Sequence, residues 1–146
     1  KLFNEHNDCR RIYLTTNLNK IDLFKSMKPY LKSPVVKEGY IFNKDINVYM
    51  YKAGDSLLSD LTFISKPRLP IYAIHKNNVK DLEIQDELIQ YDLQTKIQVW
   101  DYNPLIFSKD NKTIDNLSLI TSYLNDDDER IEKEIEQLLE VTLGER

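Results

Sequence analysis

The segment Lys96–Asp110, KIQVWDYNPLIFSKD, constrains the fold of this chain more than any other. It contains the only tryptophan among 146 residues, in an alternating run from Lys96 to Trp100 that is typical of a strand. A Tyr-Asn-Pro break follows, and then a second apolar run, Leu105–Phe107, predicts another strand. Strands and helices are expected before this segment, and acidic helices after it.

Residues 35–52 predict a β-hairpin, with one arm at Tyr40–Phe42, a turn at Asn43–Asp45 and the other arm at Ile46–Tyr51. In the second arm the period of two places a core face opposite a tyrosine face. Tyrosines beside lysines suit stacking on the bases of single-stranded nucleic acid, although tyrosine also covers half-buried sheets routinely. The core face would consist of Ile46, Val48 and Met50, and the stacking face of Tyr49 and Tyr51.

Hydrophobic periodicity predicts the other elements. The predicted strands are Arg11–Thr15, Leu61–Ile64 and Ile71–Ile74. The predicted helices are residues 20–32, with Pro29 near the end, Asp81–Asp92, residues 117–124 and residues 128–143. The last helix carries an apolar stripe that either docks on the sheet or binds a partner, and its candidate partner-binding residues are Ile131, Ile135 and Leu138.

Together these elements predict an α+β fold (mixed α/β). We expect a mixed sheet of five or six short strands with three or four helices, ending in a long amphipathic helix. The length predicts one globular domain over residues 1–146, with an acidic amphipathic helix at residues 125–143. The chain does not begin with methionine, so we expect a fragment of a longer protein.

A single cysteine, Cys9, excludes an internal disulfide and fits a reducing compartment. No apolar run approaches the roughly 18–20 residues that a membrane span requires. The first residues contain no apolar region typical of a signal peptide. We therefore predict a cytoplasmic protein with no membrane partner.

The net charge of −4 conceals a strong asymmetry along the chain. Residues 1–76 contain 13 lysines and arginines against 7 acidic residues, whereas residues 77–146 contain 7 against 17. Either the two halves neutralise each other in the fold, or the basic half binds nucleic acid. The candidate nucleic-acid-binding residues are Lys25, Lys28, Lys32, Lys44, Lys52, Lys66, Arg68, Tyr49 and Tyr51.

Signatures of catalysis and of metal binding are weak. His6 and Cys9 form a lone H-x-x-C pair, too few ligands for a zinc site, so we predict no metal and no cofactor. No phosphate-binding glycine loop or nucleophile motif occurs, and the chain has only three glycines. The acidic run Asp126–Glu129 stands where a helix N-terminus favours capping and negative charge.

Three further carboxylates leave one catalytic alternative open. Asp101, Asp110 and Asp115 flank the central segment, and carboxylates near a strand end can bind Mg²⁺ for phosphoryl chemistry. A nuclease of the restriction type would also carry a Glu-x-Lys on an adjoining strand, and no predicted strand carries it. A Mg²⁺-dependent nuclease or phosphoryl-transfer domain is therefore the alternative to a non-catalytic domain.

Residues 96–140 resemble the C-terminal domain of the abortive-infection type IV antitoxins. The resemblance lies in the run Val99–Pro104, the helix with the pattern Ile-Asp-x-Leu-Ser-Leu at Ile114–Leu119, and the helix start Asp128-Glu129-Arg130. It implies an α/β antitoxin domain behind an operator-binding winged helix, a role in antiviral defence and transcription regulation, and a nucleotidyltransferase-like toxin as partner. The chain lacks a winged-helix segment, so no DNA-binding residue is carried over.

The sequence therefore predicts an antitoxin-like regulatory domain that acts through contacts with a protein and with nucleic acid. A structural oligomerisation domain, in which the last helix pairs with its own copy, is the other non-catalytic reading.

Overall fold

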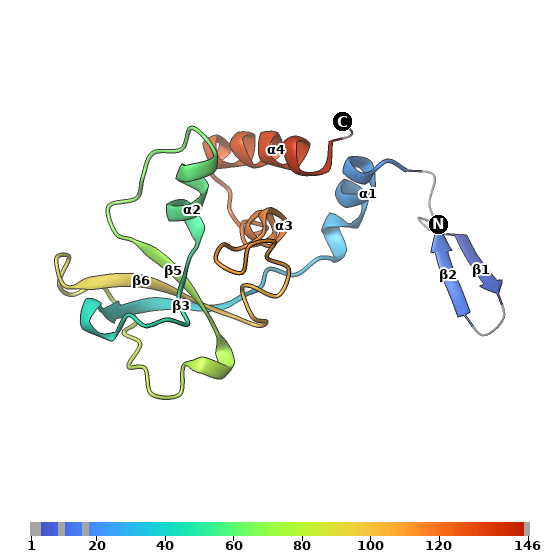
Figure 1. Cartoon of the computed structure of the whole chain (residues 1–146). Coiled ribbons are helices and arrows are strands. Elements are labelled where there is room, and N and C mark those ends of the chain that lie inside the picture. Colours follow the sequence, from blue (N-terminus) through green and yellow to red (C-terminus); the bar gives the residue numbers. More distant parts are fainter. Residues whose placement is uncertain (1–3, 9–10, 16–17, 145–146) are drawn as a thin grey trace.

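Residues 4–8, 11–15 and 18–144 are described by a computed structural model, and they form a four-stranded sheet, a separate two-stranded hairpin and four α-helices (Figure 1). The strands are β1 (Asn4–Asp8), β2 (Arg11–Thr15), β3 (Val35–Phe42), β4 (Tyr51–Lys52), β5 (Ile71–His75) and β6 (Gln94–Trp100). The helices are α1 (Lys20–Met27), α2 (Gly54–Leu61), α3 (Asn116–Thr121) and α4 (Glu129–Leu143). These elements confirm the α+β class.

The sheet has the strand order β3-β6-β5-β4. β6 pairs antiparallel with β3 and parallel with β5, and β4 pairs antiparallel with β5. The prediction of a mixed sheet is therefore confirmed. The sheet has four strands instead of five or six, because β1 and β2 pair with each other in a sheet of their own.

The central strand β6 is buried on both faces. Its side chains alternate between two apolar clusters, with Ile97 and Val99 in one and Trp100 in the other. Trp100 and Ile97 have no solvent exposure. A strand that is paired on both edges and covered on both faces needs apolar residues in both directions, and β6 supplies them with Ile97, Val99 and Trp100.

Polar side chains on β6 are buried together with these apolar residues. Gln94 Oε1 accepts hydrogen bonds from the backbone N–H groups of Ile89 and Gln90, each at 2.7 Å. Gln98 Oε1 accepts a hydrogen bond from Trp100 Nε1 at 3.1 Å. Because a buried polar group without a partner is costly, these bonds offset part of the cost of burying the two glutamines, although Gln94 Nε2 has no hydrogen-bond partner among the described residues.

Helices α2, α3 and α4 cover one face of the sheet (Figure 1). Leu57 and Leu58 of α2, Leu119 of α3 and Leu138 of α4 are buried in the same cluster as Trp100. Full burial of one such leucine contributes roughly 1.5–3 kcal/mol, so apolar packing is enough to hold three short helices on the sheet.

Irregular chain covers the opposite face. Buried Met50, with partly buried Leu82 and Ile84, packs against the apolar side chains of β3, β5 and β6 there. The backbones of Tyr40 and Gln85 exchange two hydrogen bonds, at 2.8 Å and 2.7 Å, which add the irregular segment to the free edge of β3. This close approach of the backbone explains why β3 carries a glycine at position 39.

The predicted hairpin over residues 35–52 is wrong. β3 pairs along its length with β6, and a 3₁₀ turn at Asn43–Asp45 directs the chain to β4 on the other edge of the sheet. Of the predicted core face only Met50 is buried, whereas Val48 is 80% exposed. The eight-residue β3 pairs far more backbone with β6 than the three-residue arm of a local hairpin would.

The predicted helix over Asp81–Asp92 is also wrong. The segment between β5 and β6 contains a short 3₁₀ turn at Lys76–Asn78 and otherwise irregular chain. Its backbone groups bond to Tyr40 and to the Gln94 side chain, and they bond to one another only in short turns, where the Leu82 N–H donates to the Val79 carbonyl and the Leu93 N–H to the Gln90 carbonyl. These non-local partners outweigh the weak helical periodicity of the segment.

Two other predicted strands are absent from the part of the chain that the structure describes. Residues Leu61–Ile64 contain the last residue of α2 and the loop that follows it. Residues Leu105–Phe107 form turns, in which the Ser108 N–H donates to the Leu105 carbonyl at 3.0 Å. A short apolar run does not by itself distinguish a strand from a turn, and Phe63, Ile106 and Phe107 are in fact exposed.

The other predicted helices and strands are confirmed in type, although α1 ends at Met27 and not at residue 32, and α3 ends at Thr121 and not at residue 124. α1 continues into a 3₁₀ turn at Lys28–Tyr30 that contains Pro29. Asn19 caps α1, because its side-chain oxygen accepts a hydrogen bond from the Asp22 N–H at 2.8 Å. Within residues 4–8, 11–15 and 18–144, no helix is long and apolar enough to cross a membrane.

We expect Gly39→Ala to destabilise the fold by about 1–3 kcal/mol. A Cβ at this position would lie 2.8 Å from the carbonyl oxygen of Gln85 and would collide with Ile84. Urea unfolding measures the effect, with Lys37→Ala, an exposed change in the same strand, as the control. Equal stability of the Gly39 variant and the parent would show that the irregular segment is not held against β3.

Candidate interaction groove between α1 and α4

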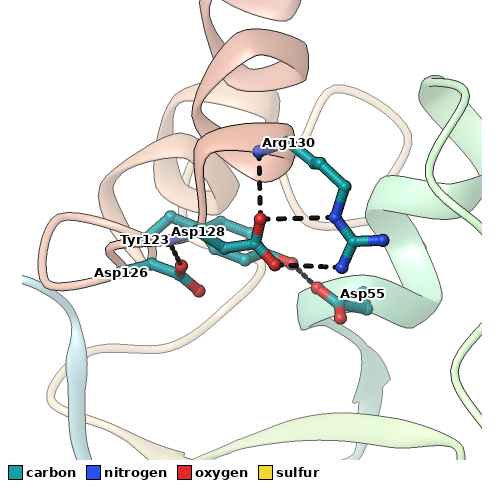
Figure 2. Close-up of polar contacts among 5 residues, drawn as sticks. All are labelled: Asp55, Tyr123, Asp126, Asp128 and Arg130. Atoms are coloured by element: carbon teal, nitrogen blue, oxygen red, sulfur yellow. Dashed lines mark hydrogen bonds and ion pairs between the residues drawn. The ribbon is translucent and has the colours of Figure 1, made fainter.

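Capping interactions hold the N-terminus of α4 (Figure 2). Asp128 Oδ1 accepts a hydrogen bond from the Arg130 N–H at 2.9 Å, and Arg130 Nη2 lies 3.2 Å from Asp128 Oδ2. The hydrogen bond from the Arg130 side chain, with that from its backbone, lowers the pKa of Asp128. The predicted capping role of the acidic run is therefore confirmed at Asp128.

Tyr123 connects the turn before α4 to α2. Its hydroxyl donates a hydrogen bond to Asp55 Oδ1 at 2.6 Å (Figure 2), and its carbonyl accepts one from the Asp126 N–H at 3.0 Å. Burial raises the pKa of Tyr123, and the neighbouring Asp55 carboxylate raises it further. The phenol therefore stays protonated and neutral, and it continues to donate to Asp55 at physiological pH.

A groove of about 500 Å³ lies beside Tyr123, between α1 and α4. Its apolar lining comes from three helices, and several of these side chains also pack against the core. The groove therefore has a floor that belongs to the folded body and does not depend on a mobile loop. The apolar side chains of this floor are Phe24, Ile120, Ile131, Ile135 and Leu139.

The rim of the groove is acidic. Five carboxylate side chains line it against two ammonium groups, Lys25 and Lys28. Lys25 Nζ lies 3.6 Å from Glu136 Oε1, an exposed ion pair that contributes little to stability. The acidic residues of the rim are Asp126, Asp127, Glu129, Glu132 and Glu136.

Four residues singled out in the sequence meet in this groove. Lys25 and Lys28 belong to the predicted nucleic-acid-binding set, and Ile131 and Ile135 to the predicted partner-binding set. Leu138, the third residue of the partner-binding set, is only 5% exposed and packs in the core under α4. The apolar stripe of α4 therefore packs on the rest of the domain, and Ile131 and Ile135 of the predicted partner-binding set remain at the groove.

The remaining basic residues do not gather at one place. Lys32 precedes β3 and Lys44 follows it, so an eight-residue strand of about 25 Å separates them. Lys44 Nζ instead lies over the ring of Phe42, 6.0 Å from its centre. One continuous basic surface across all seven cations is therefore not formed.

Other members of the set have partners of their own. Lys52 Nζ lies 2.8 Å from Asp60 Oδ2, and its hydrogen bond lowers the pKa of Asp60. The guanidinium of Arg68 lies over the ring of Tyr91 at 5.1 Å. Lys66 is exposed on the loop after α2. Two exposed ion pairs join the basic half of the chain to the acidic half, Lys25 with Glu136 and Lys76 with Asp101, whereas Lys52 and Asp60 both lie in the basic half.

The two tyrosines of the predicted stacking face separate. Tyr51 lies in β4 and packs against the core on the helical side of the sheet. Tyr49 lies in the preceding loop, where its N–H donates to Asn47 Oδ1 at 2.9 Å and its side chain is 53% exposed. They do not form one aromatic platform.

The three carboxylates of the magnesium alternative have separate structural roles. Asp101 accepts a hydrogen bond from Lys76 Nζ at 2.6 Å, and Asp115 caps α3 by accepting one from the Ser118 N–H at 2.9 Å. Asp110 accepts bonds within its own turn. Among the described residues, no three His, Cys, Asp or Glu side chains are placed to hold a metal ion. Cys9 and the His6 side chain lie outside the description.

Sequence reasoning missed half of the groove. The sequence identified Phe24 only as one apolar residue of a predicted helix. No pattern near it indicated that α1 lies beside α4. Asp55 and Tyr123 are 68 residues apart, so no motif could relate them. The acids of the rim were visible, but only as a helix start.

We expect Tyr123→Phe to destabilise the protein by about 1–3 kcal/mol, because Asp55 loses a short hydrogen bond in a half-buried setting. Thermal unfolding measures the loss. Tyr30→Phe, at a tyrosine that is 80% exposed, is the matched control and should be neutral. If both variants have the same melting temperature as the parent, the contact between Tyr123 and Asp55 does not stabilise the turn between α3 and α4.

Asp110 should make the fold sensitive to acid. Hydrogen bonds from the backbone N–H groups of Lys112 and Thr113 lower its pKa from 3.8 to about 2. A lowered pKa stabilises the folded state above the ordinary value, and this contribution disappears as pH falls from about 4 to about 2. Melting temperatures across this range should fall more steeply for the parent than for Asp110→Asn. Parallel slopes would contradict the assignment.

Comparisons of the chain with known protein families, with curated proteins and with solved structures found no match. The resemblance of residues 96–140 to the abortive-infection type IV antitoxins therefore stays a prediction. The geometry and the charge of the groove are therefore the observations on which a functional proposal can be based.

Proposed function

We propose that this domain is a non-catalytic interaction module whose groove between α1 and α4 binds a basic amphipathic segment of a partner protein. The observation that carries the proposal is the combination of an apolar floor with an acidic rim in one depression of the surface. Apolar anchors of the partner would enter the floor, and its lysines or arginines would face the rim.

The floor supports the first half of this proposal. Phe24, Ile131 and Ile135 are only partly buried by the fold, so each retains apolar surface that a ligand can cover. Burying such surface releases water and supplies affinity in proportion to the area covered. An amphipathic helix with anchors at helical spacing is the form of segment that suits a groove between two helices.

The rim supports the second half. Glu132 and Glu136 are four residues apart on α4, and Glu129 is one turn before Glu132. Like charges at this spacing destabilise a helix by about 0.2–0.5 kcal/mol per pair. Lys25 relieves this repulsion at one position only, at 3.6 Å from Glu136. The basic residues of a partner would relieve the remaining repulsion between these glutamates. Their attraction to the acidic rim would also accelerate association.

The antitoxin resemblance suggests which protein the partner is. In that family the partner is a nucleotidyltransferase-like toxin, and we carry this over as part of the proposal, together with a cytoplasmic location. Nucleic-acid binding has less support, because Lys32 and Lys44 flank opposite ends of β3 and Lys52 is paired with Asp60. Magnesium catalysis has less support because Asp101, Asp110 and Asp115 each have another role.

The proposal is tested by capturing partners from the host on the full chain and on charge variants. Replacing Glu132 and Glu136 together by lysine should weaken the captured complex at least about tenfold. Glu140→Lys is the matched control, because Glu140 is an exposed acid on the same helix outside the groove. A peptide copied from the basic segment of the partner should compete.

Three outcomes would overturn the proposal. One is equal capture by the double variant and by Glu140→Lys. Another is capture that disappears on nuclease treatment, which would return the basic residues to consideration. The third is self-association as the only interaction, which would favour the oligomerisation reading.

A further inference from the structure

A second cavity, of about 640 Å³, lies between the segment after β6, α3 and the end of α4. It shares no lining residue with the groove between α1 and α4. Its volume falls within the roughly 300–1,000 Å³ of ordinary small-molecule sites. The lining combines apolar and aromatic side chains with polar and charged ones.

The apolar walls of this cavity continue from the core. The ring of Tyr102 contacts Trp100 edge to face at 5.7 Å on one side and Phe107 at 6.0 Å on the other. Phe107 is 64% exposed, although it is a large aromatic side chain in a rigid turn region. Tyr102 and Phe107 thus offer aromatic surface to a ligand, beside Leu117 and Leu143.

The polar groups of the cavity are hydroxyls and carboxylates. Tyr102 Oη donates a hydrogen bond to Ser118 Oγ at 2.8 Å. Burial raises the pKa of Tyr102, so its phenol remains neutral. Asn116 Nδ2 donates to Thr142 Oγ1 at 3.0 Å, which joins α3 to α4 at the cavity wall.

Asp115 is the one polar residue of the lining with a buried oxygen left over. Its Oδ2 accepts the capping bond from the Ser118 N–H at 2.9 Å. Its Oδ1 is buried and has no hydrogen-bond partner among the described residues. The Asp115 side chain as a whole is half-buried and lines the cavity, so it brings a negative charge to the cavity wall.

The other charges decide the sign of that ligand. Asp110 also lines the cavity, but its oxygens already accept bonds from Ser108, Lys112 and Thr113. Lys109 is the single basic residue of the lining, against two carboxylates. An anion would be repelled by both acids, whereas an ammonium or guanidinium group would be attracted.

We propose that this cavity binds a small organic cation, with its ammonium or guanidinium group on Asp115 and its apolar body against Tyr102 and Phe107. A charge-assisted hydrogen bond to a carboxylate is stronger than a neutral one, which makes Asp115 the determinant of ligand charge. The rings of Tyr102 and Phe107 can pack against a flat or apolar part of the ligand. They do not determine the structure of that part further.

The test uses three probes of one shape and different charge: 2-phenylethylammonium, 2-phenylethanol and phenylacetate. Each is titrated into the full chain and followed by amide NMR. The ammonium probe should shift the amides of Ser118 and Thr113, and it should bind at least about tenfold more tightly than the alcohol. Phenylacetate should not bind.

Asp115→Asn isolates the charge, because asparagine caps helices as well as aspartate does. This variant should lose the preference for the ammonium probe, with affinity falling at least about tenfold. Asp101→Asn, which removes an acid outside the cavity, should bind like the parent. Equal affinity for the ammonium and the alcohol in the parent protein would overturn the proposal. So would unchanged binding by Asp115→Asn, or the absence of binding at millimolar probe.

Discussion

The burial of β6 on both faces and both edges is the constraint on which the rest of the structure depends. Ile97 and Val99 require cover on one side, and Trp100 requires it on the other. Three helices supply one cover and irregular chain supplies the second. The internal hydrogen bonds of Gln94 and Gln98 make this burial compatible with polar residues, and they also hold the neighbouring loop in place.

Both candidate sites are extensions of this core. The ring of Tyr102 contacts Trp100 in the core and also contacts Phe107. These two contacts connect the core to the wall of the second cavity. The bond between Tyr123 and Asp55 holds the turn before α4 against α2, and α4 then forms one side of the groove. A binding surface supported in this way is preformed, so the protein loses less conformational entropy when it binds a ligand.

Sequence reasoning succeeded where local chemistry decides the structure. The alternation up to Trp100, the caps Asn19 and Asp128, and the apolar stripe of α4 are each readable within a few residues. It failed where the partner of a segment is distant. The arms of the expected hairpin were locally plausible, but β3 gains more by pairing with β6, and residues 79–93 gain more by bonding to Tyr40 and Gln94 than to themselves.

The amino-acid sequence by itself determined the α+β class, the central strand, the terminal helix and the unequal charge of the two halves. Only the tertiary structure decided which charges and apolar groups meet. It separated Lys32 from Lys44 by the length of β3, placed Lys25 and Phe24 beside α4, and left Asp115 Oδ1 buried without a donor among the described residues. The reason is physical: periodicity fixes the face on which a side chain lies, whereas sites form between faces that distant segments bring together.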